Sequence, residues 1–131
     1  MIEFAMTDIK VEQFAIVQPD FPGLEDIRLM TELSYQYSLE SKEVACLLGF
    51  TFKKDEKPLL IINCTCIFSI NPKDWESMVT ENGIVLPKEL MELLAVQTIG
   101  VTRGILFCKT EGSDYQKLIV PPINVRAMLE N

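Results

Sequence analysis

The chain has 131 residues, of which 48% are hydrophobic and 24% are charged, and this balance is typical of a single globular domain covering residues 1–131. The formal net charge of −7, from 19 acidic and 12 basic residues, argues against a groove that holds nucleic acid through its phosphates. No apolar run approaches the roughly 20 residues of a membrane span, and the amino terminus lacks the pattern of a signal peptide. We therefore expect a cytoplasmic protein that neither binds nucleic acid nor inserts into membranes.

Little in the sequence supports catalysis or metal binding. Histidine is absent, and there is no glycine-rich phosphate loop, nucleophile elbow or paired-carboxylate motif. Cys64 and Cys66 would point to the same face of a strand, so a metal or thiol site is conceivable. The usual zinc spacings are missing, however, and we expect all four cysteines, including Cys46 and Cys108, to be small core side chains in a reducing compartment. The sequence thus predicts no enzyme activity, no metal and no cofactor.

Four segments predict long strands of one antiparallel sheet. The first covers 9–18. The second, 27–39, is the clearest, because six of its seven odd positions from Ile27 to Leu39 are apolar or aromatic while most even positions are polar. The third and fourth, about 44–53 and 58–70, form a hairpin that turns at 54–57.

The hairpin is unusual because both of its faces are apolar. Its even positions, which run from Cys46 to Phe52 and from Leu60 to Phe68, would line the core. A half-exposed hairpin should be polar at the odd positions. Here the odd positions include Leu47, Leu59, Ile61 and Ile67. One covering helix therefore leaves an apolar face that needs a second partner.

A short helix is predicted at 71–79, because Asn71 can cap it and Pro72 suits its first position. Trp75, the only tryptophan, lies in this helix. Its side chain either packs over a sheet edge or forms the wall of an apolar groove. Packing is the commoner role, because large aromatic side chains are usually buried.

A long helix is predicted at about 88–109, and it is apolar over more than half of its circumference. Gly100 and Gly104 lie one turn apart in it, and each costs about 1 kcal/mol of helix propensity. Close approach of another backbone would offset this cost, so we expect the helix to lie between the sheet and another subunit. An extended piece at 118–120 and a final short helix at about 123–130 complete an α+β fold.

The order of these elements and three motifs resemble the SecB-type export chaperone family. The motifs are "IFSI" at 67–70, the pair Arg103-Gly104 late in the long helix, and "LIVPPINVRAML" at 118–129. In the last motif the positions that fall on the family's pattern are Leu118, Pro122, Asn124, Val125 and Ala127. The chain departs from that pattern in a longer stretch at 105–117, in having Val125 where an aromatic is usual, and in stopping at Asn131 without the carboxy-terminal tail of export chaperones.

The resemblance implies a four-stranded antiparallel sheet with one long helix packed on it and a short C-terminal helix. It also implies a homo-oligomer, dimer or tetramer, whose sheets join edge to edge and whose long helices are sandwiched between them. We expect the oligomer interface to include Ile99, Gly100, Arg103 and Gly104. The outer sheet face would then bind unfolded or extended polypeptide in a groove formed by Leu47, Leu59, Ile61, Ile67 and Trp75.

The expected function is that of a nucleotide-independent chaperone in protein export or toxin–antitoxin control. A carrier of small apolar ligands and an obligate structural oligomer without clients remain the alternatives.

Overall fold

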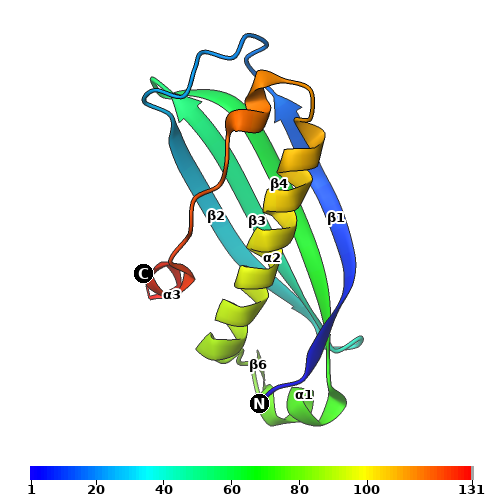
Figure 1. Cartoon of the computed structure of the whole chain (residues 1–131). Coiled ribbons are helices and arrows are strands. Elements are labelled where there is room, and N and C mark those ends of the chain that lie inside the picture. Colours follow the sequence, from blue (N-terminus) through cyan, green and yellow to red (C-terminus); the bar gives the residue numbers. More distant parts are fainter. Residues whose placement is uncertain (131) are drawn as a thin grey trace.

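The computed structural model describes residues 1–130 and contains a four-stranded antiparallel sheet with its helices on one side (Figure 1). The strands are β1 (Phe4–Ile16), β2 (Arg28–Ser38), β3 (Glu43–Lys54) and β4 (Lys57–Ile70). Their order across the sheet is β1-β4-β3-β2, so β1 and β2 form its edges. The α+β fold predicted from the sequence is confirmed.

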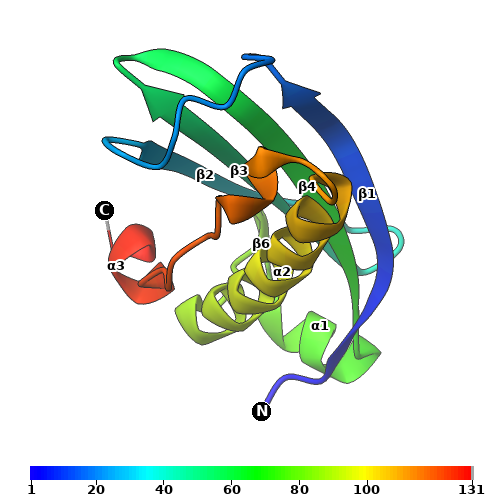
Figure 2. The same cartoon turned by 45° about the horizontal axis from the view of Figure 1, so that its top comes forward.

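The helices follow the sheet in the chain. They are α1 (Pro72–Met78), α2 (Lys88–Lys109), a 3-10 turn η1 (Asp114–Lys117) and α3 (Val125–Leu129), and a small hairpin of β5 (Val79–Thr80) and β6 (Gly83–Ile84) precedes α2. The Asn71 side chain caps α1 by accepting a hydrogen bond of 2.9 Å from the backbone of Lys73. The sheet curves around α2, and its other face carries no helix (Figure 2).

The core lies between α2 and the even positions of β3 and β4. Phe50 and Ile62 sit opposite each other in the register and are fully buried. They meet the inner side of α2, where Leu94 and Ala95 are also fully buried. Because burying one such side chain contributes about 1.5–3 kcal/mol, this layer is the main source of stability.

Strand β1 begins earlier than the predicted 9–18. Its pairing with β4 shifts between Met6 and Asp8 and again between Val11 and Gln13. Each shift moves the apolar residues from one parity to the other, so a period of two residues is not maintained along the strand. The alternation of apolar residues therefore did not reveal the first residues of β1 that pair with β4, where Phe4 lies opposite Ile70.

Helix α2 is long and apolar enough to cross a membrane by length and composition alone. The core helix of a soluble domain has the same composition, and α2 packs on the sheet with Thr98 and Thr102 fully buried and Thr110 buried directly after its last residue. The hydroxyls of Thr98, Thr102 and Thr110 donate hydrogen bonds of 2.8, 2.8 and 2.7 Å to the carbonyl four residues earlier. These bonds satisfy polar groups that burial would otherwise leave unpaired.

Candidate functional site

The sheet face that turns away from α2, here called the open face, carries apolar side chains on its central strands. Leu47, Ile61 and Ile67 all lie there, and each is partly exposed. The register sets them opposite Thr65, Thr51 and Ala45, respectively. The three predicted groove residues therefore share one face. A row of paired residues across β2, β3 and β4, which are Glu32, Gly49 and Asn63, separates Ile61 from the other two.

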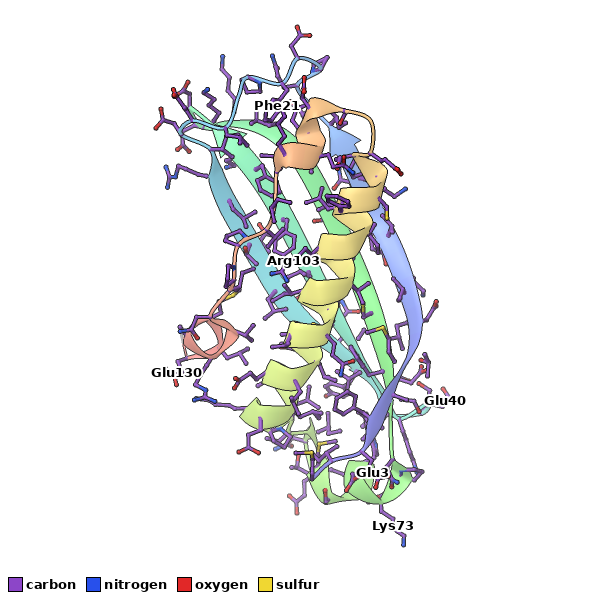
Figure 3. The ribbon with its side chains drawn as sticks, in the orientation of Figure 1. Glu3, Phe21, Glu40, Lys73, Arg103 and Glu130 are labelled. Carbon is purple, nitrogen blue, oxygen red and sulfur yellow. The ribbon has the colours of Figure 1, made fainter. Side chains whose placement is uncertain are left out.

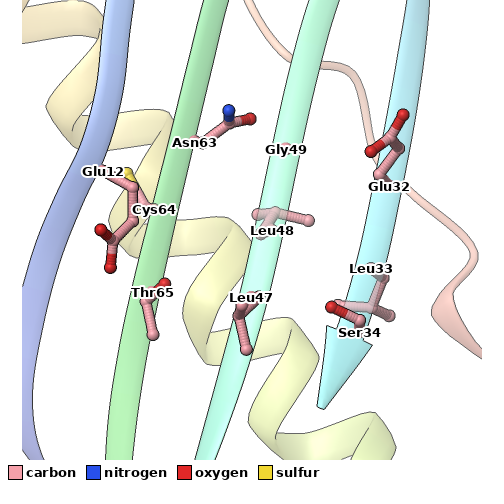
Figure 4. A pocket seen from close by; sticks show the side chains of 10 residues that line it. All are labelled: Glu12, Glu32, Leu33, Ser34, Leu47, Leu48, Gly49, Asn63, Cys64 and Thr65. Atoms are coloured by element: carbon pink, nitrogen blue, oxygen red, sulfur yellow. The ribbon is translucent and has the colours of Figure 1, made fainter. Parts of the chain in front are cut away.

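A hollow on the open face is lined by this row of residues, with Gly49 in the middle of the row (Figure 4). Gly49 lies opposite Asn63 of β4 and Glu32 of β2. A Cβ added at Gly49 would come within 2.6 Å of the Asn63 Oδ1 atom, so the Asn63 side chain takes up the room that a side chain at Gly49 would need. The hollow has a volume of about 430 Å³, and we call it the Gly49 hollow.

The Gly49 hollow presents hydrogen-bond acceptors. Asn63 Nδ2 donates to Gln13 Oε1 at 2.9 Å, which leaves Asn63 Oδ1 facing Gly49. Glu12 and Glu32 stand on its two sides, from β1 and β2 (Figure 4), and no lysine or arginine is among its lining residues. A group that donates hydrogen bonds and carries positive charge suits this environment.

Two predicted groove residues lie elsewhere. Leu59 is only 4% exposed, because the register shifts between Phe52 and Lys53 and breaks the odd–even pattern at this point of β4. Trp75 is 1% exposed, since α1 turns it into the core. Neither side chain is accessible in this conformation, so Leu59 and Trp75 do not belong to a surface groove.

The outward side of α2 is a second apolar surface. Val96 and Phe107 are 54% and 50% exposed, and Leu93 is exposed beside them. Gly100 and Gly104 lie on the same stripe, and a Cβ at either would meet nothing within 4 Å. Of the predicted interface residues, Gly100 and Gly104 thus face outward, Arg103 is partly buried and Ile99 is buried against the core.

Arg103 lies where α2 meets the extended segment before α3 (Figure 3). One guanidinium nitrogen donates to the carbonyl of Pro121 at 3.4 Å, while its Nε atom is buried and has no partner among the described residues. Beside it is an apolar hollow of about 440 Å³ between α2 and residues 118–120, which we call the helix hollow. An unpaired buried N–H costs free energy, so this site favours a partner that supplies an acceptor.

The cysteines divide into two groups. Cys46, Cys64 and Cys66 are buried, as expected, whereas Cys108 is exposed on α2, which corrects its expected place in the core. Burial raises the pKa of the Cys46 thiol to about 11, and burial also raises the pKa of Cys64 and Cys66. A raised pKa disfavours the thiolate that nucleophiles and metal ligands require. Within residues 1–130, no cluster of three or more histidine, cysteine or acidic side chains is arranged to hold a metal.

The polar members of the open face were not predicted from the sequence. Gly49 was a detectable signal, because a glycine inside a strand often marks a close approach or an unfilled site. Its neighbours Asn63 and Glu32 could be assigned only once the cross-strand register was known. The exposure of Val96 and Phe107 also depended on which side of α2 faces the sheet.

Comparisons with known proteins relate this geometry to a fold. No family model matches the sequence, and no curated protein matches it. Among solved structures, the SecB-like chaperone of Mycobacterium tuberculosis in complex with a ChAD peptide from an antitoxin matches with a TM-score of 0.55 and 11% identity, over 92% of this chain and 91% of that one. A protein of unknown function from Streptococcus agalactiae matches with a TM-score of 0.46 and 10% identity, over 95% of this chain and 98% of that one. The chain therefore has a SecB-like fold.

Proposed function

We propose that the protein is a nucleotide-independent chaperone that binds unfolded or extended apolar polypeptide segments in the cytoplasm. The observation that carries this proposal is the open face, where Leu47, Ile61 and Ile67 remain partly exposed on a SecB-like fold. The mycobacterial protein of this fold binds a peptide from an antitoxin. A client of the same kind, or a protein awaiting export, fits the open face.

Apolar contacts would provide most of the affinity. Each fully buried apolar side chain contributes about 1.5–3 kcal/mol, and ordering the client offsets part of this sum. Three or four such contacts thus support binding of about micromolar strength. Such binding needs no energy source, so clients would be released by transfer or by folding.

The outward side of α2 would join two copies of the chain. Leu93 and Phe107 lie equally far from Gly100 along the helix, as do Val96 and Gly104. In an antiparallel pair with its two-fold axis beside Gly100, Leu93 of one copy is level with Phe107 of the other, and Val96 is level with Gly104. Val96 thus meets a glycine while Leu93 meets Phe107, and the exposed glycines permit close helix packing.

A second candidate function is a carrier of small apolar molecules. One observation favours it: the helix hollow is apolar, and its lining includes Arg103, whose buried Nε atom has no partner among the described residues. An apolar molecule ending in a carboxylate would fill the hollow and pair with the Arg103 guanidinium. The carrier and the helix pair use the same surface of α2, so they exclude each other.

Native mass spectrometry of the purified protein, before and after addition of a chemically unfolded test protein, distinguishes these functions. A chaperone forms a complex with the unfolded protein and does not bind its native form. A carrier retains a small apolar molecule and ignores the unfolded protein. A tight oligomer that binds neither would contradict both proposals and favour a purely structural role.

A further inference from the structure

Strand β2 is an open edge of the sheet. It runs for 11 residues, and its register with β3 continues without a shift from Arg28–Lys53 to Ser38–Glu43. Among the described residues, its only backbone hydrogen bond outside the sheet comes from Lys42 N to Ser38 O, at its very end. Alternate N–H and C=O groups along β2 thus point outward without a protein partner, which is a template for another strand.

The opposite edge is protected. The two register shifts in β1, after Met6 and after Val11, interrupt its backbone pattern. Asp8, Lys10 and Glu12 also place charges along it. Bulges and charges are the usual devices that prevent strand addition. Strand β2 contains neither proline nor glycine nor bulge, and Glu32 is the one charge in its interior.

The side chains beside this edge specify what a strand there should present. On the α2 side, Leu29, Leu33 and Tyr35 pack partly buried against the core. Near the start of β2, the same side opens into an apolar hollow of about 340 Å³ whose lining includes Leu29 and Ile119. On the open face, Glu32 stands at the rim of the Gly49 hollow (Figure 4). An added strand would therefore place alternate side chains against apolar neighbours and the others beside a carboxylate.

We infer that the β2 edge binds an extended client segment as a fifth strand, with apolar side chains toward the α2 side and a lysine or arginine beside Glu32. The inference rests on the proposed chaperone function and adds to it the location of main-chain binding and the preferred charge of the client. Backbone hydrogen bonds hold segments of varied sequence, while the side chains supply selectivity.

The test uses a fluorescently labelled peptide of alternating leucine and serine, with one central serine replaced by arginine, and a matched peptide with glutamate at that position. Fluorescence anisotropy with the wild-type protein should show tighter binding of the arginine peptide. Glu32→Lys should reverse the order, with each peptide's affinity changing by roughly tenfold. Asp8→Lys, the same charge change on the protected edge, should leave the order unchanged.

Backbone pairing has its own readout. Only alternate amides of an antiparallel strand point at its neighbour. Of two arginine peptides that are N-methylated on alternating amides, one should lose binding at least tenfold and the other should retain it. Equal effects of the two methylation patterns would show that the peptide does not bind as a strand.

The outcomes separate this inference from the function on which it rests. Peptides that bind regardless of charge and of Glu32→Lys overturn the inference but leave polypeptide binding intact. No peptide binding by a protein that still suppresses aggregation also overturns it, because clients then bind elsewhere. Failure of both assays refutes the chaperone function as well. If instead Glu32→Lys dissociates the protein into smaller species, the β2 edge is occupied by a second copy of the chain, which contradicts binding of a client there.

Discussion

Single residues decide what the open face can accept, and Gly49 is the clearest case. Its Cβ position is filled by the Asn63 Oδ1 atom at 2.6 Å. The neighbouring side chains leave a space bordered by the carboxylates of Glu12 and Glu32. A glycine inside a strand lowers the stability of that strand. Gly49 therefore lowers the intrinsic stability of β3 at the position where β3 borders the Gly49 hollow.

We predict that Gly49→Ala destabilises the wild-type protein by about 1–3 kcal/mol, because the added methyl group must displace Asn63. In the background of Asn63→Ala, the same change should be neutral or stabilising by about 0.5–1 kcal/mol, since alanine suits a strand better than glycine. Urea unfolding of the four proteins in this double-mutant cycle measures both effects. A Gly49→Ala cost that persists without Asn63 would mean that another contact, and not Asn63, closes the space.

The buried thiols predict a pH dependence of stability. Burial raises the pKa of Cys46 from its ordinary value of 9.0 to about 11, so the unfolded chain loses this proton first as the pH rises. The contribution of the buried, protonated Cys46 thiol to the free energy of unfolding is therefore fully present below pH 9 and is lost as the pH increases toward 11. We expect the free energy of unfolding to fall over this interval, by at most about 1.4 kcal/mol per pH unit for this group.

Cys46→Ala should reduce that pH slope even though it lowers stability at pH 7. Cys108→Ala is the matched control, because its side chain is exposed. Urea titrations at several values between pH 8 and 11 provide the comparison. An unchanged slope in Cys46→Ala would place the pH dependence on other groups.

At the scale of the elements, α2 is the part of the fold that the sequence predicted best, with the same bounds of 88–109. Apolar residues recur along the whole helix and cover more than half of its circumference. Pro87 precedes the helix and polar residues follow Lys109, so both of its ends could be predicted. Strands β2 to β4 were also confirmed to within a residue or two, because β2 alternates and the turn residues 54–57 separate the apolar runs of β3 and β4. Strand β1 was not, since its two bulges change the parity of the apolar residues.

The candidate site was less predictable than the elements. Alternation gave the faces of Leu47, Ile61 and Ile67, but the register shift beside Leu59 and the burial of Trp75 depend on contacts far apart in the sequence. The extended piece predicted at 118–120 makes no strand pairing in the structure, although Leu118 and Val120 are buried there. A sequence pattern reports which side chains alternate, and tertiary packing decides which of them remain accessible.

Helix α2 also gives a prediction about assembly. A Cβ at Gly104 would meet nothing within the chain, so Gly104→Ala should raise helix stability by about 1 kcal/mol. Gly104 is exposed within one chain, so Gly104→Leu should also fold. In the proposed helix pair, however, the larger side chain collides with Val96 of the other copy and should weaken association at least tenfold. Sedimentation velocity combined with thermal unfolding separates the two effects, and a wild-type protein that is monomeric at micromolar concentration would contradict the helix pair.

The whole molecule has apolar surfaces on both sides of one sheet-and-helix layer. The outward side of α2 and the open face are separated by the core, so a copy of the chain can cover the first while the second stays accessible (Figure 2). If the protein is the chaperone that we propose, its net charge of −7 would favour basic clients over acidic ones. We propose that the two apolar surfaces have different roles, the outward side of α2 in assembly and the open face in client binding.

One measurement tests that claim most directly: light scattering of a chemically unfolded test protein during its aggregation, with the wild-type protein, Ile61→Glu or Val85→Glu present. Ile61 lies partly exposed on the open face, whereas Val85 is 62% exposed before α2, so both variants should remain folded by circular dichroism. We predict that the wild-type protein and Val85→Glu suppress aggregation without nucleotide and that Ile61→Glu does not. Full suppression by a folded Ile61→Glu variant would contradict client binding on the open face.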